Sequence, residues 1–338
     1  MFRTLVVPLD TSPLSEEAAW KAATVARSTH ATLHFVHVYE PQLPAFEGGA
    51  AADERIVALE RAQYERHLRS VADRITKRFG CKCVTAMLGG TPAEAIVTYA
   101  RQQGADLLVM STHGRTGMSR AWFGSVADTI ARESSLPVLL VRRDDGTSLL
   151  ERETRDGAFE RILIALDGSD TAESILECVR SMRTSTNAEH MLVEVVRPVS
   201  IPIIDYPDVG VVMAAAPDVE ATAALAESAR RYLEGVAHRL DSEGAAKVET
   251  KVLVAPSAGP AIVDLARDFR ADLVAMTSHG RGASRLLVGS VADKILRGTH
   301  CSILFRRTPV AKAASPRRRA HNKSALVEKR VLASRSDS

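Results

Sequence analysis

Residues 111–127 contain the types and spacing of residues expected at a site that binds an anion. Nine residues separate Ser111-Thr-His-Gly114 from Gly124-Ser125-Val126-Ala127, which stands at the start of an expected helix. Glycine lets backbone N–H groups approach a ligand closely, and a helix N-terminus attracts negative charge. The Ser125 hydroxyl adds a hydrogen-bonding group. Since neither GxxxxGK[ST] nor GxGxxG occurs, a phosphate site here would lack the lysine of a P-loop.

The same arrangement occurs again later in the chain. Thr277-Ser-His-Gly280 precedes Gly289-Ser290-Val291-Ala292, with eight residues between the two glycines. An alternative is that Gly114 only ends a strand and that Ser125 only caps a helix. The repetition favours an anion site, although common descent explains part of the agreement.

Other polar residues give weaker indications of chemistry. His113 and Arg115, and likewise His279 and Arg281, could bind phosphate, but we expect the histidines to cap strand ends. His34 and His37 lie three residues apart on an expected strand, so they face opposite sides of the sheet and cannot share a metal. Because no catalytic constellation is apparent, we predict no catalytic residue and no metal ligand.

The similarity between the two halves extends well beyond these loops. Thr4-Leu-Val-Val-Pro-Leu-Asp10 matches Arg161-Ile-Leu-Ile-Ala-Leu-Asp167, and Gly124-Ser-Val-Ala-Asp128 recurs as Gly289-Ser-Val-Ala-Asp293. Two copies of this size indicate a domain duplication rather than a solenoid. We expect a first domain at 1–143, a linker at 144–157, a second domain at 158–307, and a basic, disordered tail at 308–338.

Each copy alternates short apolar runs with longer helical patterns. In copy one (residues 1–143) the expected strands are 4–9, 32–38, 82–88, 107–111 and 138–142, and the expected helices are 12–29, 54–78, 92–103 and 125–133. This alternation predicts parallel α/β sheets. In copy two (residues 158–307), the apolar segment 209–216 is expected to lie in a long loop, as a lid on its own domain or a contact for a partner.

Composition and charge limit the possible classes of function. The chain has 338 residues and a net charge of +3, and the excess of Lys and Arg lies in the tail. The 4% aromatic content leaves little material for stacking on bases, so we expect no nucleic-acid partner. No apolar run is long enough for a membrane span, and the N-terminus does not match a signal peptide. We therefore expect a cytoplasmic protein.

Taken together, these motifs resemble the universal stress protein family, in the form of a tandem two-domain member. The resemblance rests on the strands that end in Asp10 and Asp167, on His37-Val38 and Glu194-Val195, and on both Gly-Ser-Val-Ala segments. It implies two tandem open five-stranded parallel sheets of order 3-2-1-4-5, with helices on both faces. It also implies pairing through the fifth strands as an intramolecular pseudo-dimer, with a homodimer as a further possibility.

The resemblance also implies a ligand. Many members of the family bind ATP, usually with Mg²⁺ or Mn²⁺ held mainly by the phosphates, through Gly-x2-Gly-x9-Gly-Ser/Thr. In copy one the implied site residues are Pro8, Leu9, Asp10, Val38, Ser111, Gly114, Gly124, Ser125 and Val126; in copy two they are Asp167, Val195, Thr277, Gly280, Gly289, Ser290 and Val291. Asp10 would hold the ribose, the Val38 backbone would read adenine, and Pro8 and Leu9 would line the base.

Both copies depart from the family motif, which leaves the function open. Ser111 and Thr277 replace its first glycine, Ala165 replaces Pro8, and the interval in copy two is one residue short. The leading hypothesis is an ATP-binding, nucleotide-dependent stress-response regulator with an unknown protein partner, non-catalytic or slowly hydrolysing ATP. The alternatives are a nucleotide-independent structural or chaperone-like interaction module and a weak ATPase.

Overall fold

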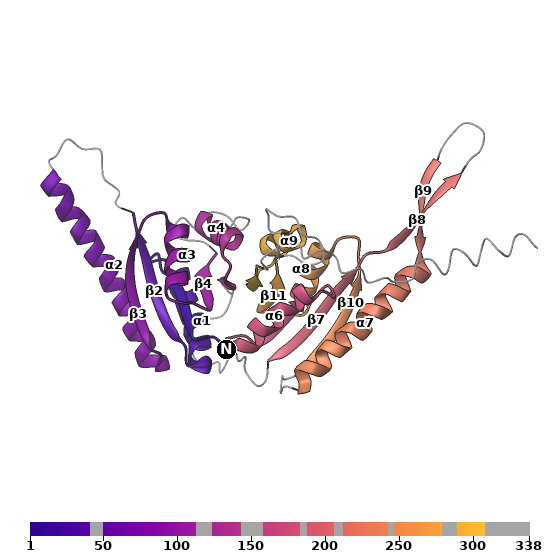
Figure 1. The fold of residues 1–338 in the computed structure, drawn as a ribbon, viewed down its shortest axis with the longest axis horizontal. Coiled ribbons are helices and arrows are strands. Elements are labelled where there is room, and N and C mark those ends of the chain that lie inside the picture. Colours follow the sequence, from indigo (N-terminus) through magenta and orange to yellow (C-terminus); the bar gives the residue numbers. More distant parts are fainter. Residues whose placement is uncertain are drawn as a thin grey trace, which may run out of the picture. The chain divides into compact units, whose positions relative to one another are not determined.

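The computed structural model (Figure 1) describes residues 1–40, 50–112, 124–142, 158–182, 188–205, 212–242, 247–278 and 289–307. Residues Met1–Thr308 form one compact unit. The linker and the basic tail expected from the sequence lie outside the described residues, as do Gly114, Gly280 and their neighbouring histidines and arginines. No helix among the described residues is long and apolar enough to cross a membrane.

Copy one contains five strands and four helices among its described residues. In chain order they are β1 (Thr4–Pro8), α1 (Pro13–Thr29), β2 (Thr32–Tyr39), α2 (Ala50–Phe79), β3 (Cys83–Gly89), α3 (Pro92–Gln102), β4 (Leu107–Ser111), α4 (Ser125–Glu133) and β5 (Val138–Val141).

Copy two repeats this order and adds a pair of strands. Its elements are β6 (Arg161–Ala165), α6 (Asp170–Ser181), β7 (Glu189–Val196), β8 (Val199–Asp205), β9 (Val212–Asp218), α7 (Val219–Ser242), β10 (Val248–Val254), α8 (Ala258–Asp268), β11 (Leu273–Thr277), α9 (Ser290–Gly298) and β12 (Ser302–Arg306).

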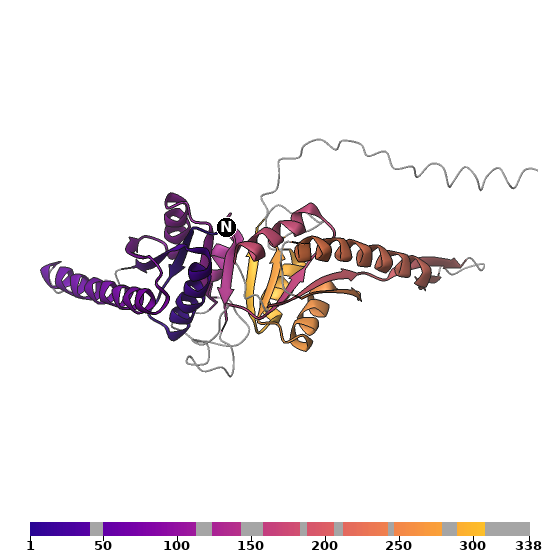
Figure 2. The ribbon, with the colours of Figure 1, turned by 90° about the horizontal axis from the view of Figure 1, so that it is seen from below.

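The two copies form one ten-stranded sheet of order β10-β7-β6-β11-β12-β5-β4-β1-β2-β3. Each half has the predicted order 3-2-1-4-5, with parallel neighbours. The halves join where β5 pairs antiparallel with β12, with Leu139 opposite Leu304. In Figure 2 these are the adjacent magenta and yellow strands. The predicted fold class and its pairing through the fifth strands are confirmed.

Side chains that alternate along the strands explain the helical layers on both faces. Val7 belongs to a core cluster with residues of α1 and α2, whereas Val6 belongs to a second cluster with residues of α3 and α4. The central strands β4, β5, β11 and β12 are buried along most of their length. Strands buried on both faces are typical of parallel sheets, which is why these segments read as nearly continuous apolar runs.

Side chains also hold the two copies together beside the strand pair. Lys21 Nζ donates to the Ala158 carbonyl at 2.8 Å, and Ser28 Oγ donates to the Met182 carbonyl at 3.0 Å. On the other face, the Arg142 guanidinium donates to the carbonyls of Leu296 and Thr299 at the end of α9.

The described part of segment 209–216, residues 212–216, lies in strand β9 and not in the long loop that the sequence predicts. Strands β8 and β9 form an antiparallel ribbon in which Val199 lies opposite Asp218 and Asp205 lies opposite Val212. Figure 1 shows this ribbon beyond the N-terminal end of α7.

Candidate functional site

The described candidate residues of copy one lie at one edge of the sheet. Asp10 follows β1, Val38 lies near the end of β2, and Ser111 ends β4. Strand β1 pairs with both β2 and β4, so these strand ends are neighbours. The Gly124 N–H donates to the Thr112 carbonyl at 2.8 Å, which places the start of α4 beside the end of β4.

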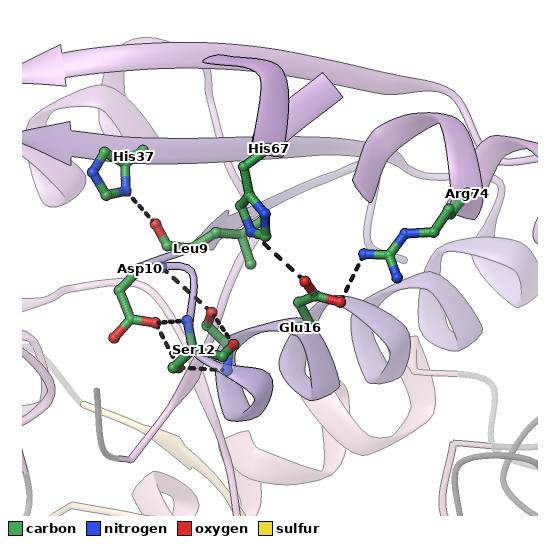
Figure 3. Close-up of polar contacts among 8 residues, drawn as sticks. Leu9, Asp10, Ser12, Glu16, His37, His67 and Arg74 are labelled. Carbon is green, nitrogen blue, oxygen red and sulfur yellow. Dashed lines mark hydrogen bonds and ion pairs between the residues drawn. The ribbon is translucent and has the colours of Figure 1, made fainter. Parts of the chain in front are cut away.

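A network of hydrogen bonds fixes the side chain of Asp10. Its Oδ1 atom accepts from the Ser12 backbone N–H at 3.1 Å and from Ser12 Oγ at 2.6 Å. Ser12 Oγ in turn accepts from the Ser15 N–H at 3.1 Å and so caps α1. Figure 3 shows the other carboxylate oxygen of Asp10 pointing away from α1. The cap that begins the helix therefore also orients the carboxylate.

The residue between Asp10 and Ser12 has an unusual backbone. Thr11 has φ +68°, in the left-handed region that β-branched residues rarely adopt. At the equivalent place in copy two, Gly168 has φ +75°. Both copies therefore use the same sharp turn, which strains the backbone only in copy one.

His37 supports this turn from the neighbouring strand. Its Nδ1 atom lies 2.6 Å from the Leu9 carbonyl oxygen, and because a carbonyl only accepts, Nδ1 carries the proton. The ring stacks on Tyr64 at 4.1 Å. Leu9 is only 2% exposed and packs in the core cluster, so its side chain does not line an open base site.

His34 lies on the opposite face of the sheet from His37, as predicted. Its Nδ1 atom is 2.9 Å from the Tyr99 hydroxyl, on α3, and burial lowers the pKa of its imidazole.

Behind the turn, Glu16 joins α1 to α2. Its carboxylate accepts from Arg74 Nη2 at 2.7 Å and lies 3.8 Å from His67 Nε2 (Figure 3). These residues were not identified in the sequence, because the partners of Glu16 lie on a different helix and carry no motif.

The start of α4 has features suited to an anion. Gly124 is its N-cap residue and has no side chain to bond the first N–H groups, whereas Ser12 caps α1. Ser125 is exposed and Val126 is half-buried. Gly124 has φ −58°, which any residue can adopt. A need for glycine here would therefore come from the close approach of a ligand to the backbone. N–H groups left to an outside acceptor are what a phosphate requires.

Copy two reproduces this geometry. Asp167 Oδ1 accepts from the Ser169 N–H at 3.1 Å and from Ser169 Oγ at 2.6 Å. The Gly289 N–H donates to the Ser278 carbonyl at 3.0 Å. Val195, Thr277, Ser290 and Val291 occupy the places of Val38, Ser111, Ser125 and Val126. The structure thus brings the described candidates together twice.

Within the part of the chain that the structure describes, no group of three or more His, Cys, Asp or Glu residues could hold a metal ion. A metal carried by phosphates would need no such group, so the prediction for Mg²⁺ or Mn²⁺ remains a prediction.

Comparison with known proteins identifies the family. The model of the universal stress protein family matches residues 1–142 and 158–307. The chain belongs to the universal stress protein family. Its two matched segments cover both copies and leave out most of the linker expected from the sequence.

Relatives exist with one domain and with two. A universal stress protein of Methanocaldococcus jannaschii is 35% identical over 147 residues, which are 42% of this chain and 84% of the relative. A universal stress protein of Mycobacterium tuberculosis is 25% identical over 315 residues, 90% of this chain and 96% of the relative. The crystal structure of a universal stress protein from Archaeoglobus fulgidus has a TM-score of 0.61 at 17% identity, covering 90% of this chain and 98% of that one. That structure supports the fold alone.

Proposed function

We propose that this universal stress protein binds ATP and acts as a nucleotide-dependent regulator of a stress response. The observation that carries the proposal is the pairing, in both copies, of an oriented carboxylate with a helix N-terminus that begins with glycine. The two groups lie at neighbouring strand ends, where open α/β sheets bind ligands.

In this proposal each described group has a role. The Asp10 carboxylate accepts a hydrogen bond from a ribose hydroxyl, and the Val38 backbone contacts the base. The first N–H groups of α4, with Ser125, hold the phosphates. Bound Mg²⁺ or Mn²⁺ would neutralise part of the phosphate charge. The corresponding groups of copy two are Asp167, Val195 and Ser290.

The proposal describes a binding protein with slow hydrolysis at most. The Nδ1–H of His37 supports the carbonyl of Leu9, the residue before Asp10, which is a structural role. We further propose a cytoplasmic location, a protein partner that reads the nucleotide state, and no role for nucleic acid.

The Asp10→Asn variant tests the proposal. Asparagine keeps an oxygen that can accept from the Ser12 N–H, removes the charge, and replaces the other carboxylate oxygen with an NH2 group that cannot accept. We expect ATP affinity in copy one to fall by about 1.5–3 kcal/mol, the value of a hydrogen bond to a charged group. Calorimetric titration with Mg²⁺, on protein stripped of nucleotide, measures this change.

Asp106→Asn is the matched control. The Asp106 carboxylate also bonds backbone N–H groups, those of Arg3 and Thr4 at 2.7 and 3.0 Å, but at the amino end of the sheet. Its variant should bind ATP as the wild type does. If folded Asp10→Asn protein retains full affinity, Asp10 does not hold the ribose.

A further inference from the structure

The two candidate sites carry different buried residues beneath turns that share the same serine cap. The Leu9 N–H donates to the Val36 carbonyl at 2.8 Å, and the Leu166 N–H donates to the Val193 carbonyl at 2.9 Å. The next residue on the strand is His37 in copy one and Glu194 in copy two. Both are nearly buried, at 9% and 8% exposure. The same position therefore holds an imidazole in one copy and a carboxyl group in the other.

The two groups have opposite chemistry at this position. His37 donates a hydrogen bond to the carbonyl of the residue before Asp10. An ionised glutamate has only acceptor oxygens, so it cannot support the Leu166 carbonyl in the same way. An imidazole is neutral or positive, whereas a carboxylate is negative. Copy two thus has a carboxyl group close to Asp167 where copy one has an imidazole, and in its ionised form this group adds a negative charge.

A second substitution points in the same direction. Arg74 pairs with Glu16 at 2.7 Å, and Arg239 pairs with Glu173 at 2.6 Å, so α2 and α7 are equivalent here. Two helical turns before each arginine stands His67 in copy one and Tyr232 in copy two.

The surroundings of Tyr232 show how the acidic groups of copy two gather. Its phenol has a raised pKa, first because of burial and then because of Glu173, Glu194 and Asp167. Three carboxyl groups therefore act on one half-buried phenol. At the places of Glu194 and Tyr232, copy one has His37 and His67, which can carry a positive charge.

We propose that these positions give the two copies different ligand preferences: copy one takes the nucleoside triphosphate, and copy two discriminates against it in favour of an uncharged nucleoside. This inference rests on the proposed function and deepens it. Charges in a poorly solvated wall act over long distances, and like-charge repulsion is an effective way to exclude a ligand. His37 and Glu194 act on ligand charge without being in contact with the phosphates.

The test compares MgATP with adenosine in variants of the full chain. Asp10→Asn first weakens binding at copy one, and Glu194→Gln is then added, which keeps the shape of the Glu194 side chain and removes its charge. We expect MgATP affinity of copy two to rise about tenfold, the effect of one unit charge about 10 Å away at intermediate dielectric constant. Adenosine affinity should change less than about twofold, since an uncharged ligand has no net charge to repel.

Reciprocal variants in copy one keep the inference testable if Glu194→Gln does not fold. With copy two disabled by Asp167→Asn, His37→Glu should weaken MgATP about tenfold and spare adenosine. His37→Gln, which is uncharged and retains an N–H donor for the Leu9 carbonyl, should weaken MgATP less than His37→Glu does. Glu189→Gln removes a charge at the far end of the same strand, β7, and should change neither ligand.

Salt provides a readout that a purely structural role would not move. The difference in MgATP affinity between wild-type protein and Glu194→Gln should shrink as NaCl rises, because salt screens charges. Equal changes for MgATP and adenosine, or no change, would overturn the inference. If the wild-type chain binds neither ligand at either copy, the proposed function fails, and this inference fails with it.

Discussion

Arg142 makes a contact between the two copies whose loss can be predicted in magnitude. It follows β5 of copy one, and its guanidinium donates to the carbonyls of Leu296 and Thr299 at the C-terminus of α9. Carbonyls at a helix end have no partner within the helix, and a cation there also interacts favourably with the helix dipole. Although burial lowers the pKa of Arg142, an arginine remains protonated.

Arg142→Met keeps an unbranched side chain, replaces the charged guanidinium with an apolar group, and removes both hydrogen bonds. Hydrogen bonds to a charged donor contribute about 1.5–3 kcal/mol each, and the two share one side chain. We therefore expect the free energy of unfolding to fall by roughly 2–4 kcal/mol. Because the contact crosses between copies, the two copies should also unfold less cooperatively.

Arg306 is the matched control, since it ends β12 as Arg142 follows β5. Its Nη1 atom donates to the Ser174 carbonyl at 3.1 Å and to Glu177 Oε2 at 2.8 Å, both on α6 of the same copy. The Glu177 side chain is largely exposed, and such pairs contribute at most about 1 kcal/mol. Arg306→Met should therefore cost less and leave cooperativity unchanged.

Urea unfolding followed by circular dichroism separates these outcomes. The wild type should show one transition, and Arg142→Met should show a lower midpoint with a broader or divided transition. The reasoning is refuted if Arg142→Met and Arg306→Met lose the same stability with the same transition width. It is also refuted if Arg142→Met unfolds as the wild type does.

Two further predictions concern stability. Burial lowers the pKa of His190 below 6.5. The unfolded chain therefore takes up a proton at this histidine at a higher pH than the folded chain does. The stability that the neutral imidazole contributes is then lost as pH falls below about 6.5. His190→Leu, which introduces the residue found at the equivalent Leu33, should flatten this decline in acid unfolding curves; an unchanged curve would contradict the assignment. At Thr11, the left-handed backbone costs about 1–2 kcal/mol and glycine loses about 0.5–1 kcal/mol of chain entropy. Thr11→Gly should therefore keep or slightly raise the melting temperature, whereas Gly168→Thr should lower it. A clear fall in the melting temperature of Thr11→Gly would show that Thr11 is not strained.

Local signals explain which elements could be predicted from the sequence. The strand Leu107–Ser111 and the helix Ser125–Glu133 were predicted with the observed bounds, because an uninterrupted apolar run and a glycine before a helical pattern mark them. The ribbon β8–β9 was missed because Pro202 cannot donate in a ladder and the alanines opposite β8 have low strand propensity.

The site divides in the same way between predictable and unpredictable parts. Asp10 and Ser111 follow or end strands, and the ends of parallel strands meet at one edge, so their proximity could be predicted. The contacts of His37 with Leu9 and of Arg74 with Glu16 could not, because they join residues 28 and 58 positions apart. One signal was available: a change from His37 to Glu194 inside a repeated motif marks a position where the copies differ in charge.

The position of that change follows from the duplication. In a symmetric homodimer of single domains, both sites carry the same residue at every position. A tandem chain removes that restriction and keeps the shared sheet, because β5 pairs with β12 as two identical subunits would pair. The turns at Asp10 and Asp167, their serine caps and the glycines that begin α4 and α9 have the same geometry. A buried imidazole and a buried carboxyl group beneath otherwise equal turns are therefore the means by which one fold can present two sites of different charge.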